Sequence, residues 1–362
     1  MLSDTLTIAP LHVPESLDAP DAADFRAMVR IGNEQWRRDS GTHLIDEDEL
    51  DLLTRWQNTT DSTHRGIVAL LGDRVVGIGV CTWDNSTTRT AEVWVNLEEE
   101  FQTPELHDRL LAEVEGIAAA DGRRVVQAFS IHRAGASGEM LDAPTGAGRI
   151  PLDRYAQDQL RNGYMLQQIE RVSAYDLQAS FDEVDRLLDE ALAAAGPDYR
   201  VVSWTGRTPE EHIEGYATII GRLSTDMPSG GLVTEQHAWD ADRIGRRDAR
   251  MERAGRLMGV VLVIHEPTRQ VAAYNELCIG PDRSTPTEQF GTLVAPEHRG
   301  RKLGSIVKCV GLKRWHEAVP ESLCVVTFNA EENRYMLDVN EAVGFTPIVS
   351  GGAWETRLTV DS

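Results

Sequence analysis

The sequence has few cysteines and no long apolar run. Its four cysteines are scattered over 362 residues without CxxC or CxxH spacing, a pattern that indicates neither a disulfide framework nor a zinc site. No apolar run reaches the roughly 18 residues that a membrane helix needs, and the N-terminus has no basic segment followed by an apolar core. We therefore expect a cytoplasmic protein without a leader, a metal or a membrane partner.

Basic residues are scarce relative to acidic ones. The chain has 36 lysines and arginines against 58 aspartates and glutamates, which gives a formal net charge of -22. This balance argues against a general attraction to nucleic acid or anionic lipid and favours small cationic partners. Because 362 residues are too many for most single hydrophobic cores, we expect two domains.

The predicted elements occur in the same order twice, after a helical, polar region at the start of the chain (21–56). In the first half the order is a hairpin that turns at Gly72 and Asp73, a strand over 90–97, a helix over 105–122 and a strand over 123–131. In the second half it is a hairpin around 266–268, a strand over 287–294, a helix over 303–319 and a strand over 322–328.

Each half then passes from a helix through a glycine and an aromatic residue into a strand, at 163–164 and at 344–345. The first half is longer by a loop over 133–150, rich in glycine, alanine and proline. We interpret the segment over 142–151 as a lid or an inter-domain contact. The repeat predicts domains over 1–195 and 196–362. The alternative is two unrelated α/β domains that share common hairpins.

Basic residues gather at the junction between the strand over 287–294 and the helix that follows it. The junction reads HRGRKLG, residues 298–304. The N-terminus of a helix carries unpaired N–H groups and the positive end of the helix dipole, so an anion is stabilised there. Its glycines let the backbone approach a ligand, and its basic residues add charge. The junction therefore predicts a pyrophosphate site, although a surface turn before an ordinary helix is an equally open interpretation.

Two segments of the second half resemble motifs of one enzyme family. RGRKLG, residues 299–304, resembles the acetyl-CoA motif Arg/Gln-x-x-Gly-x-Gly/Ala of the GNAT acetyltransferases, except that Lys302 stands at the central glycine position. NRYMLDVNEAVGF, residues 333–345, resembles the family's later segment, which starts at an asparagine and ends in Gly-Phe. The whole arrangement is similar to the tandem GNAT proteins of actinobacteria, a group that includes mycothiol synthase-like enzymes.

The resemblance implies an α/β architecture of two GNAT folds in tandem, each a central mixed, mostly antiparallel sheet flanked by helices. It also implies acetyl-CoA as the cofactor, with its pantetheine arm between two splayed parallel strands, 287–294 and 322–328. The residues that it places around the cofactor are Leu293, Val294, Arg299, Gly300, Arg301, Lys302, Leu303, Gly304, Ser305, Asn329 and Asn333.

The same resemblance implies direct transfer of the acetyl group to a neutral amine, which needs a base and a proton donor. Glu288 is the candidate base, although an exposed strand carboxylate is an equally open interpretation. Asn340 stands where the family has its general-acid tyrosine, so it could hydrogen-bond the thiolate or the cofactor while protonation comes from water or from Tyr335. The alternative for Tyr335 is a packing residue. Cys324 is better explained as a structural thiol than as a nucleophile.

The segment over 224–240 would cover the acceptor site in this family. Asp226 and Glu235 within it, together with Glu276, could collect around a cationic amine, and His237 could bind the acceptor. A solvated surface is the alternative for each of these acidic residues.

The first half lacks the glycines and the basic residues of the phosphate site. With Val95 aligned to Val294, the corresponding positions read EEEFQTP, residues 98–104, and three carboxylates would repel a pyrophosphate. We therefore expect a degenerate N-terminal domain and a catalytic C-terminal one.

The resulting hypothesis is an acetyl-CoA-dependent N-acetyltransferase that acts on a primary amine of a small, cationic acceptor, as a monomer or homodimer. One alternative is a mycothiol synthase-like enzyme that acetylates an amino-sugar thiol precursor. Another is a non-catalytic acyl-CoA-binding or interaction protein, which Lys302 and Asn340 favour.

Overall fold

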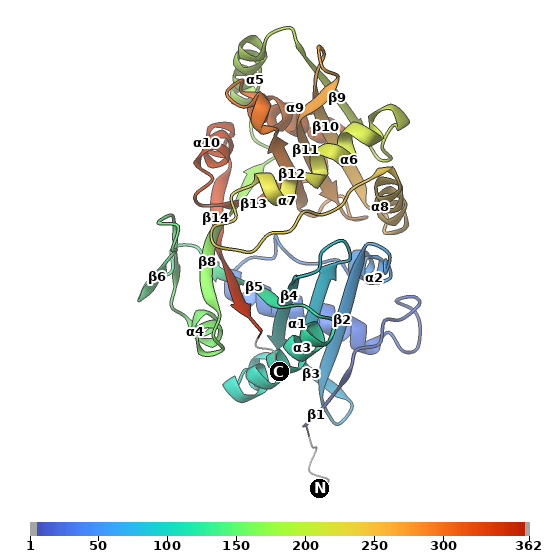
Figure 1. Ribbon diagram of the computed structural model, residues 1–362, viewed down its shortest axis with the longest axis vertical. Coiled ribbons are helices and arrows are strands. Elements are labelled where there is room, and N and C mark those ends of the chain that lie inside the picture. Colours follow the sequence, from blue (N-terminus) through green and yellow to red (C-terminus); the bar gives the residue numbers. More distant parts are fainter. Residues whose placement is uncertain (1–5, 359–362) are drawn as a thin grey trace. The chain divides into compact units, whose positions relative to one another are not determined.

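The computed structural model describes residues 6–358, which divide into two compact units (Figure 1). The first unit comprises 6–170, 229–235 and 349–358, and the second comprises 171–228 and 236–348. This division differs from the predicted boundary at 195/196: the second unit begins at 171, and 229–235 and the end of the chain from 349 belong to the first unit. The expectation about an N-terminal leader falls partly on residues 1–5, which lie outside the described residues.

The strands of the first unit pair in the order β1-β2-β3-β4-β5-β14, where β14 is Thr346–Arg357, and among these pairs only β4 with β5 is parallel. Its elements are β1 (Leu6–Pro10), α1 (Ala23–Ser40), α2 (Glu49–Trp56), β2 (Ser62–Leu71), β3 (Arg74–Asp84), β4 (Thr90–Leu97), η1 (Glu99–Phe101), α3 (Pro104–Ala120), β5 (Val125–Arg133), β6 (Met140–Asp142), β7 (Arg149–Pro151) and α4 (Arg154–Arg161). The predicted loop over 133–150 is not all irregular, because β6 and β7 pair as a short antiparallel hairpin.

Alternating side chains of the strands bury the two faces of this sheet under different helices. On β2, Ile67 and Ala69 belong to the core that α3 covers, whereas Val68 between them belongs to the core under α1 and α2. This is the period of two that a strand buried on both faces requires.

The second unit has a sheet with the strand order β13-β12-β11-β10-β9, in which only β12 and β13 are parallel. Its elements are α5 (Asp182–Ala195), β9 (Tyr199–Thr205), η2 (Glu210–His212), α6 (Ile213–Gly221), α7 (Leu223–Asp226), α8 (Ala241–Arg253), β10 (Leu257–His265), β11 (Gln270–Ile279), β12 (Thr287–Val294), η3 (Pro296–His298), α9 (Leu303–Ala318), β13 (Cys324–Ala330) and α10 (Arg334–Val343). On β10, Val260 and Leu262 pack under α6 and α8, and Val261 and Val263 pack with α9 and α5.

The predicted repeat is confirmed by the order of the elements. Each half runs through a strand, two principal helices, three antiparallel strands, a helix, a parallel strand, a helix and a last strand. The two last strands are β8 (Met165–Asp176) and β14 (Thr346–Arg357), and each passes from one unit into the other. Residues 349–357 of β14 pair antiparallel with β5, so the C-terminal strand completes the sheet of the first unit.

The parallel pair in each unit is hydrogen-bonded over a short stretch only. β12 and β13 pair at Thr287 with Val325 and at Glu288 with Val326. β4 and β5 pair over three residues, from Thr90 to Glu92. Beyond these points the strands diverge, as the family resemblance implied for 287–294 and 322–328. Among the described residues no helix is both long and apolar enough to cross a membrane.

A buried polar network ties β5 to α4 and β14 in the first unit. Ser130 Oγ lies 2.7 Å from His132 Nε2, and His132 Nδ1 lies 2.8 Å from Asp153 Oδ2. The serine hydroxyl also accepts a hydrogen bond of 2.8 Å from Trp354 Nε1. Ser130 and His132 are almost fully buried, so this Ser-His-Asp arrangement has no accessible nucleophile and acts as a structural connection.

Removing the serine hydroxyl should destabilise the first unit. Ser130→Ala leaves two buried polar groups, the Trp354 indole N–H and a His132 ring nitrogen, without this partner, and the expected loss is about 1–3 kcal/mol of the free energy of unfolding. Urea unfolding measures it. Ser350→Ala, the same change at a half-buried serine of β14, should cost no more than about 0.5 kcal/mol. Equal stability of the two variants would contradict the assignment.

Candidate functional site

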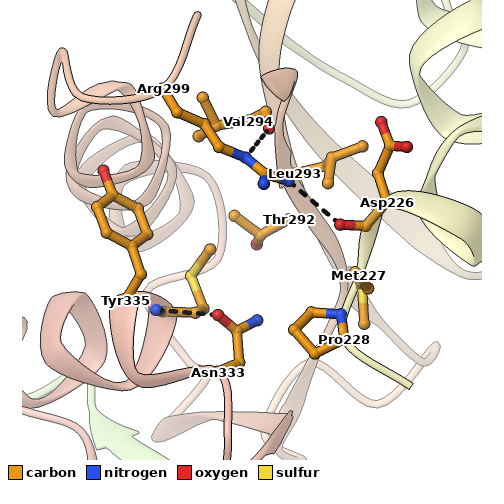
Figure 2. A pocket seen from close by; sticks show the side chains of 10 residues that line it. Asp226, Met227, Pro228, Thr292, Leu293, Val294, Arg299, Asn333 and Tyr335 are labelled. Carbon is orange, nitrogen blue, oxygen red and sulfur yellow. Dashed lines mark hydrogen bonds between the residues drawn. The ribbon is translucent and has the colours of Figure 1, made fainter. Parts of the chain in front are cut away.

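A cavity of about 360 Å³ lies in the second unit beside the C-terminal half of β12 (Figure 2). Its walls come from the end of α7 and the two residues after it, from the end of β12, from the start of α10 and from the loop before α9. The lining residues are Asp226, Met227, Pro228, Thr292, Leu293, Val294, Arg299, Asn333, Tyr335 and Met336. The sequence predicted six of them as site residues.

Arg299 holds two of these walls together. Its Nε donates to the Val294 carbonyl oxygen at 3.3 Å and an Nη donates to the Asp226 carbonyl oxygen at 3.2 Å (Figure 2). The Asp226 carboxylate accepts from Arg222, which also pairs with both carboxylate oxygens of Glu297 at 2.8 and 3.0 Å. The Arg222 guanidinium lowers the pKa of Glu297 to about 2. Hydrogen bonds and ion pairs therefore connect the loop before α9 with α7 and with the end of β12.

The N-terminus of α9 has no side-chain cap. The N-cap residue is Lys302, whose side chain accepts no hydrogen bond from the helix, and the first backbone bond of the helix there runs from Ile306 N to Lys302 O at 3.2 Å. The N–H groups of the first turn, Leu303 to Ser305, are thus left for a ligand or for water. A Cβ added to Gly304 in this turn would lie 3.6 Å from the Val294 side chain and 3.7 Å from the Tyr335 ring, which is ordinary contact distance.

Lys302 adopts the backbone conformation that a glycine would take. Its φ and ψ are 54° and 22°, in the left-handed region, and Gly300 two residues earlier also has a positive φ of 81°. This explains why the family motif has glycine at the position of Lys302. The lysine ammonium lies 3.5 Å from Glu190, and the Arg301 guanidinium lies 5.6 Å from the centre of the Tyr199 ring.

The corresponding end of α3 in the first unit is closed by its own side chains. Thr103 accepts a hydrogen bond from Leu106 N at 3.3 Å, and Pro104 occupies the first position of the helix. Glu98 is buried and accepts from Arg30 at 2.7 Å and from Arg74. The N-terminus of α3 is thus capped and lies next to the Glu98 carboxylate, whereas the N-terminus of α9 in the second unit has uncapped N–H groups.

Sequence reasoning missed a buried lysine where β12 and β13 part. Lys308 Nζ donates to Gln289 Oε1 at 3.1 Å, and Gln289 Nε2 donates to Thr327 Oγ1 at 2.7 Å. Burial lowers the pKa of Lys308 to about 7. Gln289 and Thr327 are the first residues beyond the paired stretch, so their side chains join the strands where backbone pairing stops. The signal in the sequence was a lone lysine among apolar residues of the helix, IVKCV.

The three predicted catalytic residues have different surroundings. Glu288 has a side chain that is 52% exposed and pairs with Arg256 at 2.6 Å. Tyr335 lines the cavity, and burial raises its pKa. Asn340 is buried: its Nδ2 donates to Asn329 Oδ1 at 2.6 Å, and its Oδ1 has no hydrogen-bond partner within residues 6–358.

The predicted cofactor residues lie together in the second unit. Leu293, Val294, Arg299 and Asn333 line the cavity, and residues 300–305 form the loop and the first turn of α9. Asn333 also begins α10, because its Oδ1 accepts a hydrogen bond from Met336 N at 3.3 Å (Figure 2).

The predicted acceptor residues are not brought together. Asp226 lines the cavity, whereas Glu276 is buried and bonded to Arg247 at 2.8 Å and to Tyr216. His237 lies in the second unit but not on the cavity wall, and its backbone N–H donates to Ser224 Oγ at 3.3 Å. Glu235 belongs to the first unit. Cys324 is half-buried, and burial raises its thiol pKa, as a structural cysteine requires.

Comparison with solved structures identifies the fold. A tandem GNAT protein from the clavulanic acid biosynthesis pathway superimposes with a TM-score of 0.72 over 99% of this chain and 100% of that chain, at 19% identity. The chain has the tandem GNAT fold. This confirms the α/β class and the two GNAT folds expected from the sequence. No family model and no curated protein matches the chain.

Two further structures share the GNAT fold at a TM-score of 0.58 and 12% identity. One is a GCN5-related N-acetyltransferase from Sphaerobacter thermophilus, matched over 100% of this chain and 99% of that chain. The other is a glucosamine N-acetyltransferase region of a fungal multi-domain β-N-acetylglucosaminidase, of which this chain covers 38%.

The conformation of Lys302 can be tested by a pair of substitutions. Lys302→Val should lower the free energy of unfolding by about 1–2 kcal/mol, because a β-branched residue is strained in the left-handed region. Lys302→Gly removes that strain and should be at least as stable as the wild type. Urea unfolding compares them, and equal stability of the valine and glycine variants would show that the residue is not left-handed.

The buried Lys308 should leave a signature in the pH dependence of stability. Its pKa is about 7 in the folded chain and roughly 10.4 when unfolded, so the unfolded state binds more protons between these values. The stability of the wild type relative to Lys308→Met should therefore rise with pH above about 7, by up to about 1.4 kcal/mol per pH unit. Urea unfolding from pH 6 to 9.5 measures the difference, and parallel pH profiles would contradict it.

Proposed function

We propose that the second unit is an acetyl-CoA-dependent N-acetyltransferase that transfers the acetyl group directly to a primary amine of a small, cationic acceptor. The observation that carries the proposal is the uncapped N-terminus of α9 beside a cavity at the point where β12 and β13 diverge. The tandem GNAT fold supports it, since solved structures with this fold include GCN5-related N-acetyltransferases.

The residues around the α9 N-terminus fit a pyrophosphate. The helix end carries roughly half a positive charge and free N–H groups, to which a phosphate can bind directly. Arg301 and Lys302 are exposed at the same end and add positive charge, while Gly300 and Gly304 keep the approach free of side chains. The lining of the cavity by Leu293, Val294 and Met336 suits a less polar arm of the cofactor.

The bound cofactor would supply an activated acetyl thioester. The chain would contribute the free edge of β12 beyond Glu288, because its backbone groups there have lost their partner strand. Opposite β11 this stretch has a bulge: Asn275 pairs with Thr292 and Leu277 with Gln289, which gives β12 one extra residue. A backbone N–H on such an edge can polarise a carbonyl and stabilise the developing oxyanion.

Two side chains would transfer the protons, Glu288 on β12 and Tyr335 on α10. Glu288 lies at the last paired position and would accept the proton of the attacking amine, directly or through water. Tyr335 lies on the cavity wall and would return a proton to the leaving thiolate. Asn340 would orient Asn329 and bind an N–H or S–H donor with its unpaired oxygen.

The acceptor would be selected mainly by charge. Asp226 is the one predicted acceptor residue that lines the cavity, although its carboxylate already bonds to Arg222. The net charge of -22 favours the approach of a cationic amine over that of an anionic one.

One observation favours a non-catalytic acyl-CoA-binding protein instead. Asn340 has an amide with no titratable proton, so it cannot act as the phenolic acid of the family, and its NH₂ group is already bonded to Asn329. Binding of acetyl-CoA without thiol release for any primary amine would establish this alternative.

The cofactor site is tested by placing a negative side chain at the helix end. Gly304→Glu should raise the KM for acetyl-CoA at least about tenfold, because the carboxylate occupies the anion position. Release of free thiol across a panel of primary amines measures it. Gly116→Glu, the same change at a helical glycine of α3, should leave the KM unchanged. An unaltered KM in Gly304→Glu would contradict the site.

The role of Glu288 is tested by removing its charge. Glu288→Gln should lower kcat about 100-fold at neutral pH with little effect on the KM for acetyl-CoA, since a positioned base contributes roughly that factor or more. Steady-state kinetics over pH 6–9 measure it, with Glu210→Gln, at an exposed glutamate, as the control. A wild-type pH profile in Glu288→Gln would exclude it as the base.

A further inference from the structure

Seven residues in the middle of 224–240, the segment expected to cover the acceptor site, belong to the first unit. Residues 229–235 belong to the first unit, while the residues on both sides belong to the second. We call 229–235 the anchor segment. The residues immediately before it, Asp226 to Pro228, form one wall of the cavity.

Glu235 fastens the end of the anchor segment. Its carboxylate accepts hydrogen bonds from the backbone N–H groups of Thr88, Arg89 and Thr90 at 3.0, 3.0 and 2.9 Å. It also accepts from the hydroxyls of Thr88 and Thr90 at 3.3 and 2.9 Å. Burial alone would raise its pKa, but these hydrogen bonds lower the pKa to about 2. Five donors on one carboxylate make a specific contact and leave little capacity for a substrate amine.

In the middle of the anchor segment, both backbone groups of Val233 are hydrogen-bonded to side chains. Val233 N donates to Glu355 Oε2 at 2.7 Å, and Val233 O accepts from Gln127 Nε2 at 2.8 Å. Gln127 and Glu355 are also bonded to each other at 3.0 Å. They lie on the paired strands β5 and β14, so the segment is attached to the rigid sheet of the first unit.

The start of the anchor segment fits only glycine. Gly230 has a φ of 57°, and a Cβ there would lie 2.5 Å from the Gln167 carbonyl oxygen. A Cβ on Gly231 would clash with the Gln167 side chain. The backbone therefore lies directly against β8, which larger residues would prevent.

We propose that Glu235 is a positioning residue: by fastening the anchor segment it restricts, through the continuous backbone, the adjoining residues Asp226 to Pro228, which line the cofactor cavity. Pro228 directly precedes the segment, and its ring restricts the backbone between the anchor and the wall. The effect expected on the KM for acetyl-CoA rests on the proposed function, whereas the effect expected on hydrogen exchange in the wall does not.

The test compares Glu235→Gln with the wild type in the full chain. The amide is nearly isosteric, but its NH₂ group cannot accept from the N–H groups that face it. Hydrogen exchange is followed at Leu232 and Val233 in the anchor segment and at Asp226 and Met227 in the wall, whose N–H groups are all hydrogen-bonded. We expect exchange to rise about tenfold or more in both places, because a charge-assisted network is lost.

The second readout is the KM for acetyl-CoA, which we expect to rise about tenfold while kcat stays within about twofold. Val233→Pro removes the N–H group that donates to Glu355, so it should also raise the KM for acetyl-CoA and speed hydrogen exchange. Glu113→Gln, the same chemical change at an exposed glutamate of α3, should match the wild type in both readouts.

The outcomes separate this proposal from the proposed function. Faster exchange in the anchor segment with an unchanged wall and an unchanged KM would overturn the proposal. Unchanged exchange in the anchor segment itself would overturn the role of Glu235. If the wild type does not bind acetyl-CoA, the proposed function fails, and faster exchange at Asp226 and Met227 in Glu235→Gln would still support control of the wall by the anchor.

Discussion

The short pairing of β12 with β13 is the constraint on which the site depends. Two residue pairs hold the parallel strands together, and beyond Glu288 and Val326 each strand has a free edge. The side-chain bond from Gln289 to Thr327, supported by the buried Lys308, spans the strands at that point. The divergence leaves a backbone edge for a ligand next to the uncapped end of α9, and both features lie within one compact unit.

The two halves share one fold but differ in a few residues at the corresponding helix end. In the first unit Thr103 caps α3 and Glu98 is neutralised between two arginines. His132 and Asp153 connect the end of β5 to α4. In the second unit the residues before α9 include Gly300 and a left-handed Lys302. Hydrogen bonds within the first unit thus take the place that an anion would need.

Local patterns in the sequence predicted most of the fold, and the family resemblance named residues that the structure brings together at the cavity of the second unit. The turn at Gly72 and Asp73, the end of α10 at Gly344 and the helix after the basic loop each depend on neighbouring residues, so they could be predicted. The partners of Glu235 and Glu276 could not, because they are distant in the sequence and acidic residues are abundant throughout. The pairing of β14 with β5 was also beyond prediction, because the alternating pattern of a strand does not specify its neighbour.

The most direct test of the account is hydrogen exchange of the whole chain with and without saturating acetyl-CoA. The account predicts slower exchange at the N–H groups of Leu303, Gly304 and Ser305, and no change over 98–103, where the first unit has closed its helix end. Slower exchange over 98–103, or no protection at the start of α9, would contradict the claim that the second unit alone holds the cofactor.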